Sequence, residues 1–279
     1  MIPKIIHYIW LGNSELPELS RHCIKSWKKY CPDYKIIKWD ETNSDISKYL
    51  FAKEAYKEKK WSFVSDVLRL ETVYKYGGVY MDTDVELIKP IDSLLSNSAF
   101  ISFESEKFVN SGNILAAEKN NKAVKAMLEK YENHSFYNAD GSLNTSPSPE
   151  YNTNALLSFG LKQNNTYQQL ETITVYPTEY FCPKSLNTGI INITNKTYGI
   201  HHFDGAWLTE DSRNLNELKQ KIHRLFGNGK IAKFAIFFSK VFIIRTKSIK
   251  RRIKKDGMKV LLNNYFIKLH LARKKRKNK

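Results

Sequence analysis

The chain has 279 residues, enough for one large α/β domain and a smaller appendage. Its formal net charge of +17 is unevenly placed, because residues 213–279 hold 22 Lys and Arg against 2 acidic residues and leave the preceding part close to neutral. Three cysteines without metal-ligand spacing argue against a disulfide framework or a cysteine zinc site, and no secretory signal is visible. We therefore expect a cytosolic domain over residues 1–211 and a basic tail over residues 212–279.

The first predicted element is a buried strand over residues 2–12, IPKIIHYIWLG, which ends at Trp10 and Gly12. In an open α/β sheet, ligands bind beyond the carboxyl ends of the strands, so Trp10 is a candidate ligand-binding residue. The alternative is that Trp10 is a core residue, which is the commoner fate of tryptophan. The next predicted elements are a helix over residues 17–30, a strand over 34–39 and a polar helix over 44–59.

Residues 61–87, WSFVSDVLRLETVYKYGGVYMDTDVEL, are the stretch around which the chain is organised. Apolar residues at helical spacing predict a helix, on whose surface Asp66 and Arg69 are neighbours because they are three residues apart. A double glycine ends this helix, since glycine adopts the left-handed C-cap conformation cheaply. A buried strand that contains Tyr80 follows.

Asp82 and Asp84 come at the end of that strand. Residues i and i+2 of an extended chain point to the same side, so the two carboxylates leave the strand together. Hard oxygen ligands suit Mg²⁺ or Mn²⁺, which proteins bind through one or two carboxylates plus substrate phosphates. By itself, an Asp-x-Asp triplet reads as a surface turn. The buried strand before it favours function, because acids at such a place need a reason to be there.

The segments SDVLR and YGGVYMDTD together resemble the sugar-transferase core of glycosyltransferase family 32. This family holds bacterial capsular and lipopolysaccharide sugar transferases and yeast-type mannosyltransferases, and the large clostridial glucosylating toxins share its core. In weaker form the resemblance extends from Ile2 to about Leu208. It implies a GT-A fold, which is an α/β domain with a mostly parallel central sheet, here followed by a basic α-helical tail. It also implies transfer from a nucleotide diphosphate sugar with retention of configuration and with Mn²⁺ or Mg²⁺ as cofactor.

The resemblance also implies roles for individual residues. Asp84 is expected to hold the metal, and Asp82 to hold ribose or a metal-bound water. Asp66 and Arg69 are expected to grip the donor sugar and ribose, while Trp10 stacks on the nucleotide base. Such stacking is typically worth ~1–3 kcal/mol.

The middle of the chain is less informative. Asn110 belongs to a predicted turn over residues 110–113, where it either hydrogen-bonds a sugar or simply forms the turn. Residues 134–154 have the composition of a loop, which predicts either a lid that binds the acceptor or a disordered segment. The remaining predicted elements are strands over 99–103, 114–117, 172–176 and 197–201 and helices over 123–132 and 154–161.

His201 and His202 end the last predicted strand, where adjacent side chains face opposite sides, so at most one of them serves. The segment HFDGAW resembles the late metal position that completes Asp-x-Asp sites. This resemblance implies His202 as the ligand and Trp207 as the residue that closes over the sugar phosphate. The candidate residues are then, for catalysis, Asp66, Arg69, Asp82 and Asp84; for substrate binding, Trp10, Asp66, Arg69, Tyr80, Asp82, Asn110 and Trp207; and for the metal, Asp84, His202 and Asp82.

The tail combines basic with apolar residues. Residues 215–225 have helical spacing, and residues 258–269 form a second amphipathic stripe. Between them, FAIFFSKVFII is too short and too charged for a transmembrane helix. This composition favours an anionic membrane surface as partner. Nucleic acid and a merely solubilising appendage are the alternatives.

We hypothesise a hexosyl or N-acetylhexosaminyl transferase of bacterial capsule, O-antigen or lipopolysaccharide synthesis, peripheral on the inner face of the cytoplasmic membrane. Its donor would be a nucleotide sugar, with a UDP-sugar favoured, and its acceptor a glycan or lipid-linked oligosaccharide. One alternative is a transferase that glycosylates a protein. The other is a non-enzymatic nucleic-acid-binding protein, against which the near-neutral body and the lack of a binding motif count.

Overall fold

The computed structural model describes residues 1–205, 210–227 and 229–239. The chain divides into two compact units, Met1–Thr209 and Glu210–Lys279, and each is described by itself. The predicted extents of the catalytic domain and of the tail remain predictions, because a compact unit need not fold alone.

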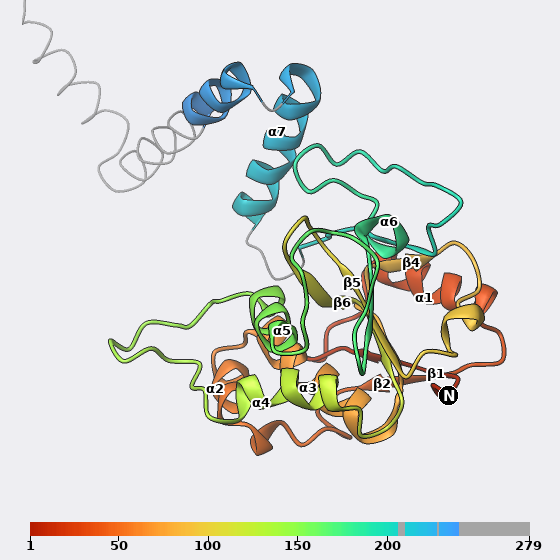
Figure 1. The fold of residues 1–279 in the computed structure, drawn as a ribbon. Coiled ribbons are helices and arrows are strands. Elements are labelled where there is room, and N and C mark those ends of the chain that lie inside the picture. Colours follow the sequence, from red (N-terminus) through yellow and green to blue (C-terminus); the bar gives the residue numbers. More distant parts are fainter. Residues whose placement is uncertain (206–209, 228, 240–279) are drawn as a thin grey trace, which may run out of the picture. The chain divides into compact units, whose positions relative to one another are not determined.

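The first unit is built on a seven-stranded sheet (Figure 1). In sheet order its strands are β2 (Lys35–Trp39), β1 (Ile5–Ile9), β3 (Gly78–Tyr80), β6 (Val109–Ala117), β5 (Ala99–Phe103), β8 (Thr174–Tyr176) and β7 (Gln168–Gln169). Only β6 and the edge strand β7 pair antiparallel to their neighbours, so the other five strands run in one direction. This confirms the α/β fold with a mostly parallel central sheet.

A second, two-stranded sheet joins distant parts of the chain. β4 (Val85–Leu87) pairs antiparallel with β9 (Gly199–His201), and the register sets Val85 opposite His201. The indole nitrogen of Trp27 donates to the Val85 carbonyl at 2.7 Å and fixes β4 against the helix that carries this tryptophan. The small sheet therefore fixes which late residue lies beside the Asp-x-Asp turn.

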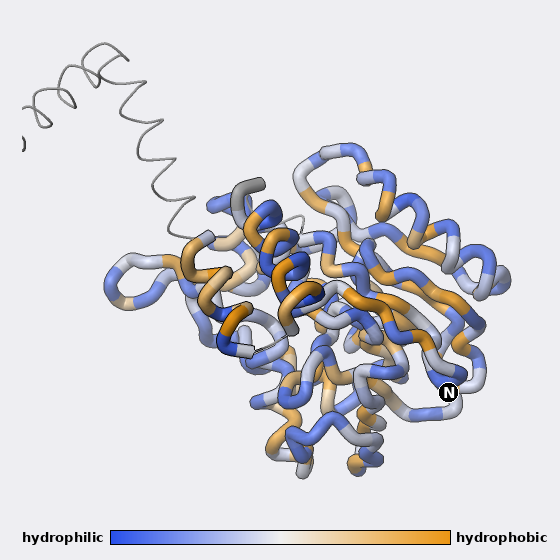
Figure 2. Tube along the Cα trace, turned by 90° about the horizontal axis from the view of Figure 1, so that it is seen from above, coloured by the Kyte–Doolittle hydropathy of each residue, from blue (hydrophilic) through white to orange (hydrophobic). Residues whose placement is uncertain are grey.

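Helices cover both faces of the large sheet. On one face, α2 (Leu50–Lys57), α3 (Trp61–Tyr76), α4 (Lys122–Glu132) and α5 (Ser148–Leu157) share one hydrophobic cluster (Figure 1). On the other, α1 (Glu18–Tyr30), β4 and the short α6 (Thr178–Phe181) share a second cluster. Figure 2 shows hydrophobic residues along the central strands and hydrophilic ones on the surrounding loops. This is the three-layer arrangement that burial of both sheet faces requires.

Local sequence signals explain the ends of several helices. α3 ends at Gly77, as the double glycine predicted, but its φ of 67° and ψ of −174° are an extended conformation open to glycine and not the left-handed helical one. α4 begins after Asn121, whose side chain accepts hydrogen bonds from the N–H groups of Ala123 and Val124. The predicted helix over residues 17–30 is also found, as α1.

Three expectations need correction. Residues 44–59 do not form one helix, because a 3-10 turn over Ile46–Lys48 precedes α2. Residues 110–113 are not a turn before a strand but part of β6, which has an irregular register opposite Ile101 and Ser102. The expected long loop over residues 134–154 ends early, since α5 begins at Ser148 after Pro147. At residues 110–113, pairing of β6 with β5 overrode the local turn preference of the asparagine, serine and glycine side chains.

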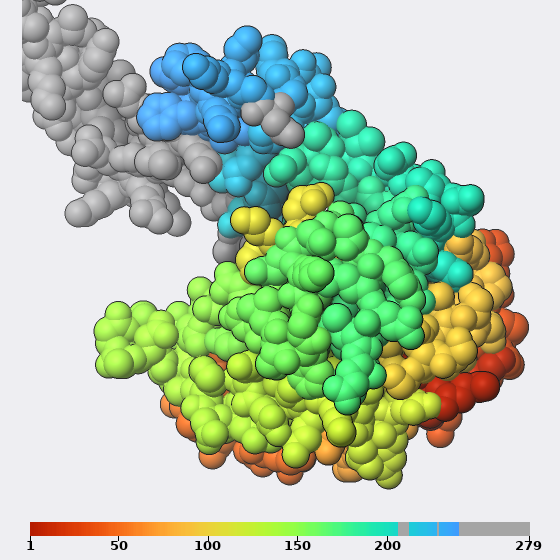
Figure 3. Space-filling view, in the orientation of Figure 1, coloured from red at the N-terminus to blue at the C-terminus, as the bar shows by residue number. Residues whose placement is uncertain are grey.

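The segment between α4 and α5 is ordered by its own contacts. A β-bridge joins Tyr137 to Leu143 within the segment. The Tyr137 hydroxyl also donates to the carboxylate of Glu58, which follows α2, at 2.6 Å. In Figures 1 and 3 this segment projects from the first unit at the left. It is a small hairpin, and its predicted role in acceptor binding stays a prediction.

The second unit begins with α7 (Glu210–Phe226), which confirms the helix predicted over residues 215–225. Residues 230–239 are helical as well. Among the described residues, no helix is both long and apolar enough to cross a bilayer. The predicted stripe over residues 258–269 lies outside the described residues.

Candidate active site

The Asp-x-Asp turn lies between β3 and β4, at the carboxyl end of β3. The Asp82 N–H donates to the Gly112 carbonyl at 2.9 Å, and the Val85 N–H donates to the Asp82 carbonyl at 3.0 Å. These two hydrogen bonds hold the turn against β6 and set the direction of both aspartates. The carboxylates therefore leave the end of a buried strand, as the sequence predicted.

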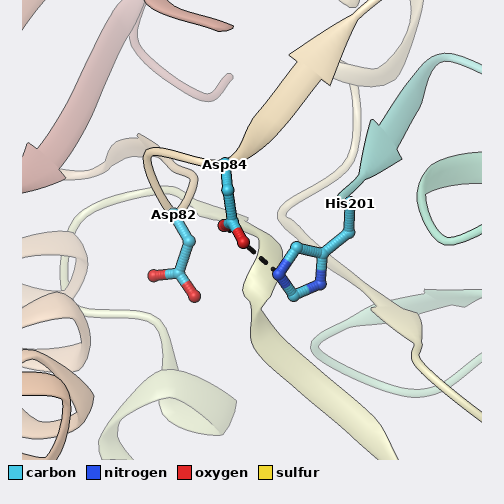
Figure 4. Close-up of side chains that lie close together, drawn as sticks. All are labelled: Asp82, Asp84 and His201. Carbon is cyan, nitrogen blue, oxygen red and sulfur yellow. Dashed lines mark ion pairs between the residues drawn. The ribbon is translucent and has the colours of Figure 1, made fainter. Parts of the chain in front are cut away.

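Asp84, which directly precedes β4, faces His201 on β9, the partner strand in the same small sheet (Figure 4). The Asp84 Oδ1 atom lies 3.3 Å from the His201 Nε2 atom, while Asp84 Oδ2 accepts a hydrogen bond from the Asp204 N–H at 2.9 Å. Asp82, Asp84 and His201, which we call the metal trio, offer ligand atoms that all lie within 4.8 Å of one another. Two carboxylates and one imidazole at this spacing fit a divalent cation.

The histidine beside Asp84 is thus His201, whereas the sequence motif selected its neighbour. The His202 Nε2 atom hydrogen-bonds to Glu86 Oε2 at 2.9 Å. The His22 Nε2 atom hydrogen-bonds to the other oxygen, Glu86 Oε1, at 3.2 Å. Adjacent residues at the end of β9 point to opposite sides, as expected, but the pairing of β9 with β4 turns His201 inward. The geometry therefore supports His201 in the role that the motif assigned to His202.

Asp84 and His201 stabilise each other's charge. Burial alone would raise the pKa of Asp84, but the charge of His201 and the Asp204 N–H outweigh burial and lower the pKa of Asp84 to about 2. Conversely, burial would lower the pKa of His201, and the Asp84 carboxylate raises it well above the usual value. The environment thus favours positive charge beside Asp84, and a bound metal cation competes with the imidazole proton for it.

A second group of side chains lies at the carboxyl-terminal side of β3 and on α3. We call Asp66, Arg69, Tyr80 and Asp82 the buried cluster. Arg69 Nη2 donates to Asp66 Oδ1 at 2.6 Å and lies 3.5 Å from Asp82 Oδ1, to which the Tyr80 hydroxyl donates at 2.7 Å. Arg69 is only 4% exposed, so its guanidinium fixes the two carboxylates rather than reaching into solvent. The structure therefore brings together all four residues that the sequence placed here.

Charge within the buried cluster is incompletely balanced. Burial raises the pKa of Asp66 to about 6, a shift that Asp82 increases and Arg69 opposes. Burial also disfavours the charge of Arg69, but Asp82, Tyr80 and Asp66 outweigh this effect and raise its pKa above the ordinary value. Arg69 is therefore a permanent cation, while Asp66 exchanges its proton near neutral pH.

Trp10 follows β1 and is partly exposed. Its indole nitrogen donates to the Ser14 carbonyl at 2.7 Å, and its ring belongs to neither hydrophobic cluster. The core-residue alternative therefore has no support from the packing. Trp207, which was expected to close over the sugar phosphate, lies outside the described residues.

Asn110 is buried, and both ends of its amide are engaged. Its nitrogen donates to the Glu104 carboxylate, and its oxygen accepts from the Gly112 N–H at 2.7 Å. This arrangement holds Gly112 so close to the site that a Cβ there would clash with Asp82 Oδ2 and the Arg69 guanidinium. Asn110 thus shapes the backbone beside the aspartates, and its predicted contact with a sugar stays a prediction.

Sequence reasoning missed four roles: His201 as the partner of Asp84, Asn113 as the partner of His201, the close approach of Gly112, and Lys184. Asn113 accepts at His201 Nδ1, and the half-buried Lys184 donates to the His202 carbonyl near Asp84 and Asp204. The continuous apolar pattern after Gly112 was the one local signal that residues 110–113 belong to a strand. Nothing local to Lys184 connects it with the aspartates, because only its tertiary hydrogen bond to the His202 carbonyl brings it near them.

Comparison with known proteins identifies the chemistry of this region. Residues 17–101, which include α3 and the Asp-x-Asp turn, match the family described as glycosyltransferase sugar-binding region containing a DXD motif. Residues 17–101 of this chain are therefore similar to the sugar-binding region of DXD glycosyltransferases. The match ends before β6 and β9, so it covers Asp82 and Asp84 but not His201.

Two curated relatives are named as mannosyltransferases. Inositol phosphoceramide mannosyltransferases 1 and 3 of Schizosaccharomyces pombe are 31% and 34% identical to the chain over 125 and 122 residues, which is 42% of this chain in both cases and 38% and 34% of the relatives. The chain thus spans little more than a third of the length of these relatives. The solved PaToxG glycosyltransferase aligns with 56% of this chain and 69% of its own at 19% identity, with a TM-score of 0.44.

Proposed function

We propose that this glycosyltransferase moves a hexosyl or N-acetylhexosaminyl group from a nucleotide diphosphate sugar to a glycan or lipid-linked acceptor, with retention of configuration. The observation that carries the proposal is the metal trio at the carboxyl end of β3, directly beside the buried cluster. Ligands of open α/β sheets bind at this edge, so both groups face the same space.

The residues of the metal trio fit Mn²⁺ or Mg²⁺. Asp82 and Asp84 supply hard oxygen atoms, and His201 supplies a nitrogen within the spacing that a single ion spans. Such an ion, when bound, neutralises charge on the leaving diphosphate. The chain's own part is to hold Asp84 Oδ2 by the Asp204 N–H, so that Oδ1 faces His201 Nε2.

The buried cluster suits recognition of the donor sugar. Asp66 accepts from Arg69 and from the Ser148 side chain, and a carboxylate, with about four lone-pair positions, keeps acceptor capacity for a sugar hydroxyl. Arg69 and Tyr80 together orient Asp82, whose second oxygen is available to ribose or to the metal. We place the base of the nucleotide on Trp10, at the end of the neighbouring strand β1.

An amphiphilic acceptor is supported by the second unit. Phe234, Phe237 and Phe238 are each more than half exposed on a helical segment that also carries Lys230 and Lys233. Aromatic side chains beside lysines bind anionic bilayer surfaces. The relatives' names, which specify inositol phosphoceramide, are consistent with an acceptor held in a membrane. We therefore propose action at the inner face of a bacterial cytoplasmic membrane, in surface-polysaccharide synthesis.

The catalytic proposal is tested with a panel of UDP- and GDP-sugars, assayed for hydrolysis with Mn²⁺, with Mg²⁺ and after EDTA treatment. We expect metal-dependent release of UDP or GDP from one donor class, and loss of release in EDTA. Hydrolysis at an equal rate in EDTA would contradict metal binding by the metal trio. Hydrolysis of none of the donors would contradict the enzyme class.

The membrane proposal is tested separately by co-sedimentation with phosphatidylglycerol or phosphatidylcholine vesicles at low and high salt. The full chain should bind the anionic vesicles. Part of this binding should persist at high salt, because the exposed phenylalanines insert into the bilayer. Replacing Phe234, Phe237 and Phe238 by serine should abolish that part, whereas replacing the exposed Leu157 and Tyr167 of the first unit should not. Equal binding of both variants would contradict the proposal, and a shift of RNA or DNA without vesicle binding would favour a nucleic-acid partner.

A further inference from the structure

We propose that Asn113 is a positioning residue that fixes the ring of His201 and presents its Nε2 atom to the metal. This inference rests on the proposed function, since it assumes that Asp84 and His201 hold a divalent cation. Asn113 itself contacts neither Asp84 nor the space in front of it, so it acts only through the imidazole. The observation behind it is a chain of contacts from β5 through β6 to β9.

The orientation of the Asn113 amide is determined by its surroundings. Asn113 is fully buried on β6, and its Nδ2 atom lies 3.3 Å from the Phe103 carbonyl oxygen and 3.4 Å from Ser102 Oγ. A carbonyl oxygen only accepts hydrogen bonds, so turning the amide over would set two acceptors against each other in a buried place. The Asn113 Oδ1 atom must therefore point away from β5.

That oxygen points at His201. The distance from Asn113 Oδ1 to His201 Nδ1 is 2.6 Å, and the two residues are 88 positions apart in the chain. An amide oxygen cannot donate, so Nδ1 must carry the proton of this hydrogen bond. In the neutral imidazole the lone pair is then on Nε2, which is the atom that faces Asp84 at 3.3 Å. Asn113 thereby selects the tautomer that a metal ligand needs.

Packing around the ring supports the same role. Phe203 lies against the imidazole with 4.2 Å between ring centroids, and the Cys182 thiol contacts it from another side. The ring is thus enclosed by an aromatic face, a thiol and the Asn113 amide. With Nδ1 held at one end, a rotation that removed Nε2 from Asp84 would also break the hydrogen bond to Asn113.

Substitution at Asn113 separates orientation of the ring from simple packing. Asn113→Leu keeps the volume but removes the acceptor, while Asn113→Asp keeps an acceptor oxygen toward His201. We expect Asn113→Leu to weaken Mn²⁺ affinity ~10–100-fold, as removal of a metal ligand's hydrogen-bond partner does. Asn113→Asp should retain affinity close to that of the wild type but lower the melting temperature, because its second oxygen replaces Nδ2 beside the Phe103 carbonyl. If Asn113 served packing alone, Asn113→Asp would weaken Mn²⁺ affinity more than Asn113→Leu, because burying a carboxylate costs more than burying an aliphatic side chain.

Asn97 supplies the matched control. Its Nδ2 atom donates to the Leu94 carbonyl at 2.8 Å and its Oδ1 atom accepts from the Thr174 hydroxyl at 2.7 Å, so its amide is engaged like that of Asn113. It lies before the first residue of β5, at the opposite end of that strand from Ser102 and Phe103. Asn97→Leu should leave Mn²⁺ affinity unchanged.

The measurement is a titration of Mn²⁺ by electron paramagnetic resonance on the full chain, with thermal unfolding of each variant as the folding check. Unchanged affinity of folded Asn113→Leu, beside a wild type that binds Mn²⁺, overturns the inference alone. A wild type that binds no Mn²⁺ instead overturns the proposed function.

If Asn113→Leu does not fold, the tautomer is read in the wild type. Long-range ¹H–¹⁵N spectra of the Mg²⁺-loaded chain, compared with His201→Gln to assign the signal, should show His201 protonated at Nδ1 only. A His201 protonated at Nε2 would overturn the proposal without any variant of Asn113.

Discussion

The two halves of the active site differ in how their charge is balanced. In the buried cluster, Arg69 supplies a permanent cation between Asp66 and Asp82, and all of the residues come from positions 66–82. In the metal trio, Asp84 faces an imidazole that arrives from β9 and whose charge depends on its protonation. The carboxylates of the first half are thus held by a cation of the chain itself, while the second half accommodates added positive charge. Under the proposed function, we infer that the first half recognises the donor and the second assists departure of its diphosphate.

The largest expected effect comes from removing charge in the metal half. Asp84→Asn should lower metal-dependent turnover ~10³-fold, since loss of a carboxylate ligand removes several kcal/mol of transition-state stabilisation. Mn²⁺ titration and donor hydrolysis measure it. The exposed Asp140, which is bonded to Ser142 in the projecting hairpin, provides the control substitution Asp140→Asn. Turnover of Asp84→Asn near the wild-type value would show that the metal half does not hold the ion.

A smaller loss should follow from crowding the boundary between the two halves. In Gly112→Ala the new Cβ meets Asp82 and Arg69, so one of them must move. A displacement of about 1 Å at a reacting centre costs ~10²-fold in rate. Gly229→Ala, where a Cβ meets nothing within 4 Å, is the control. If Gly112→Ala keeps full turnover at unchanged stability, the close approach of β6 has no role in the reaction.

The buried cluster should be recognised by its pH-dependent stability. Because the pKa of Asp66 rises from 3.8 to about 6 on folding, the folded chain holds this proton more tightly than the unfolded chain. Its contribution is therefore fully present below about pH 4 and is lost as pH rises through about 6, which amounts to about 3 kcal/mol. Relative to Asp66→Asn, the wild type should lose that much between pH 4 and 7 in denaturant titrations. Parallel pH profiles for the two proteins would contradict the raised pKa.

The smallest expected effect concerns the nucleotide. Trp10→Ala should weaken binding of free UDP or GDP by ~1–3 kcal/mol, as loss of an aromatic platform does, and should leave the melting temperature unchanged. Trp27, which is fully buried and bonded to Val85, gives the opposite expectation, because Trp27→Ala should lower stability by about 3–5 kcal/mol. Calorimetric titration and thermal unfolding distinguish them. A destabilised Trp10→Ala with normal nucleotide affinity would show that Trp10 is a core residue and not a nucleotide platform.

The sequence by itself determined the buried cluster and one side of the metal trio. The three-residue spacing of Asp66 and Arg69 sets them on one turn of a helix, and the two-residue spacing of Asp82 and Asp84 sends both carboxylates from one strand end. The double glycine also predicted the end of the helix, because the positive φ that Gly77 adopts there is readily accessible only to glycine. Each of these relations spans only a few residues, so backbone geometry alone fixes it.

Only the tertiary structure decided which histidine and which asparagine join them. The pairing of β9 with β4 selects His201 over His202, and the irregular register between β5 and β6 brings Asn113 to its ring. A shift of one residue in either pairing would turn every side chain of that strand to the other face. Local sequence carries no record of such a register across 88 positions, because it is set by how two buried strands fit the same core.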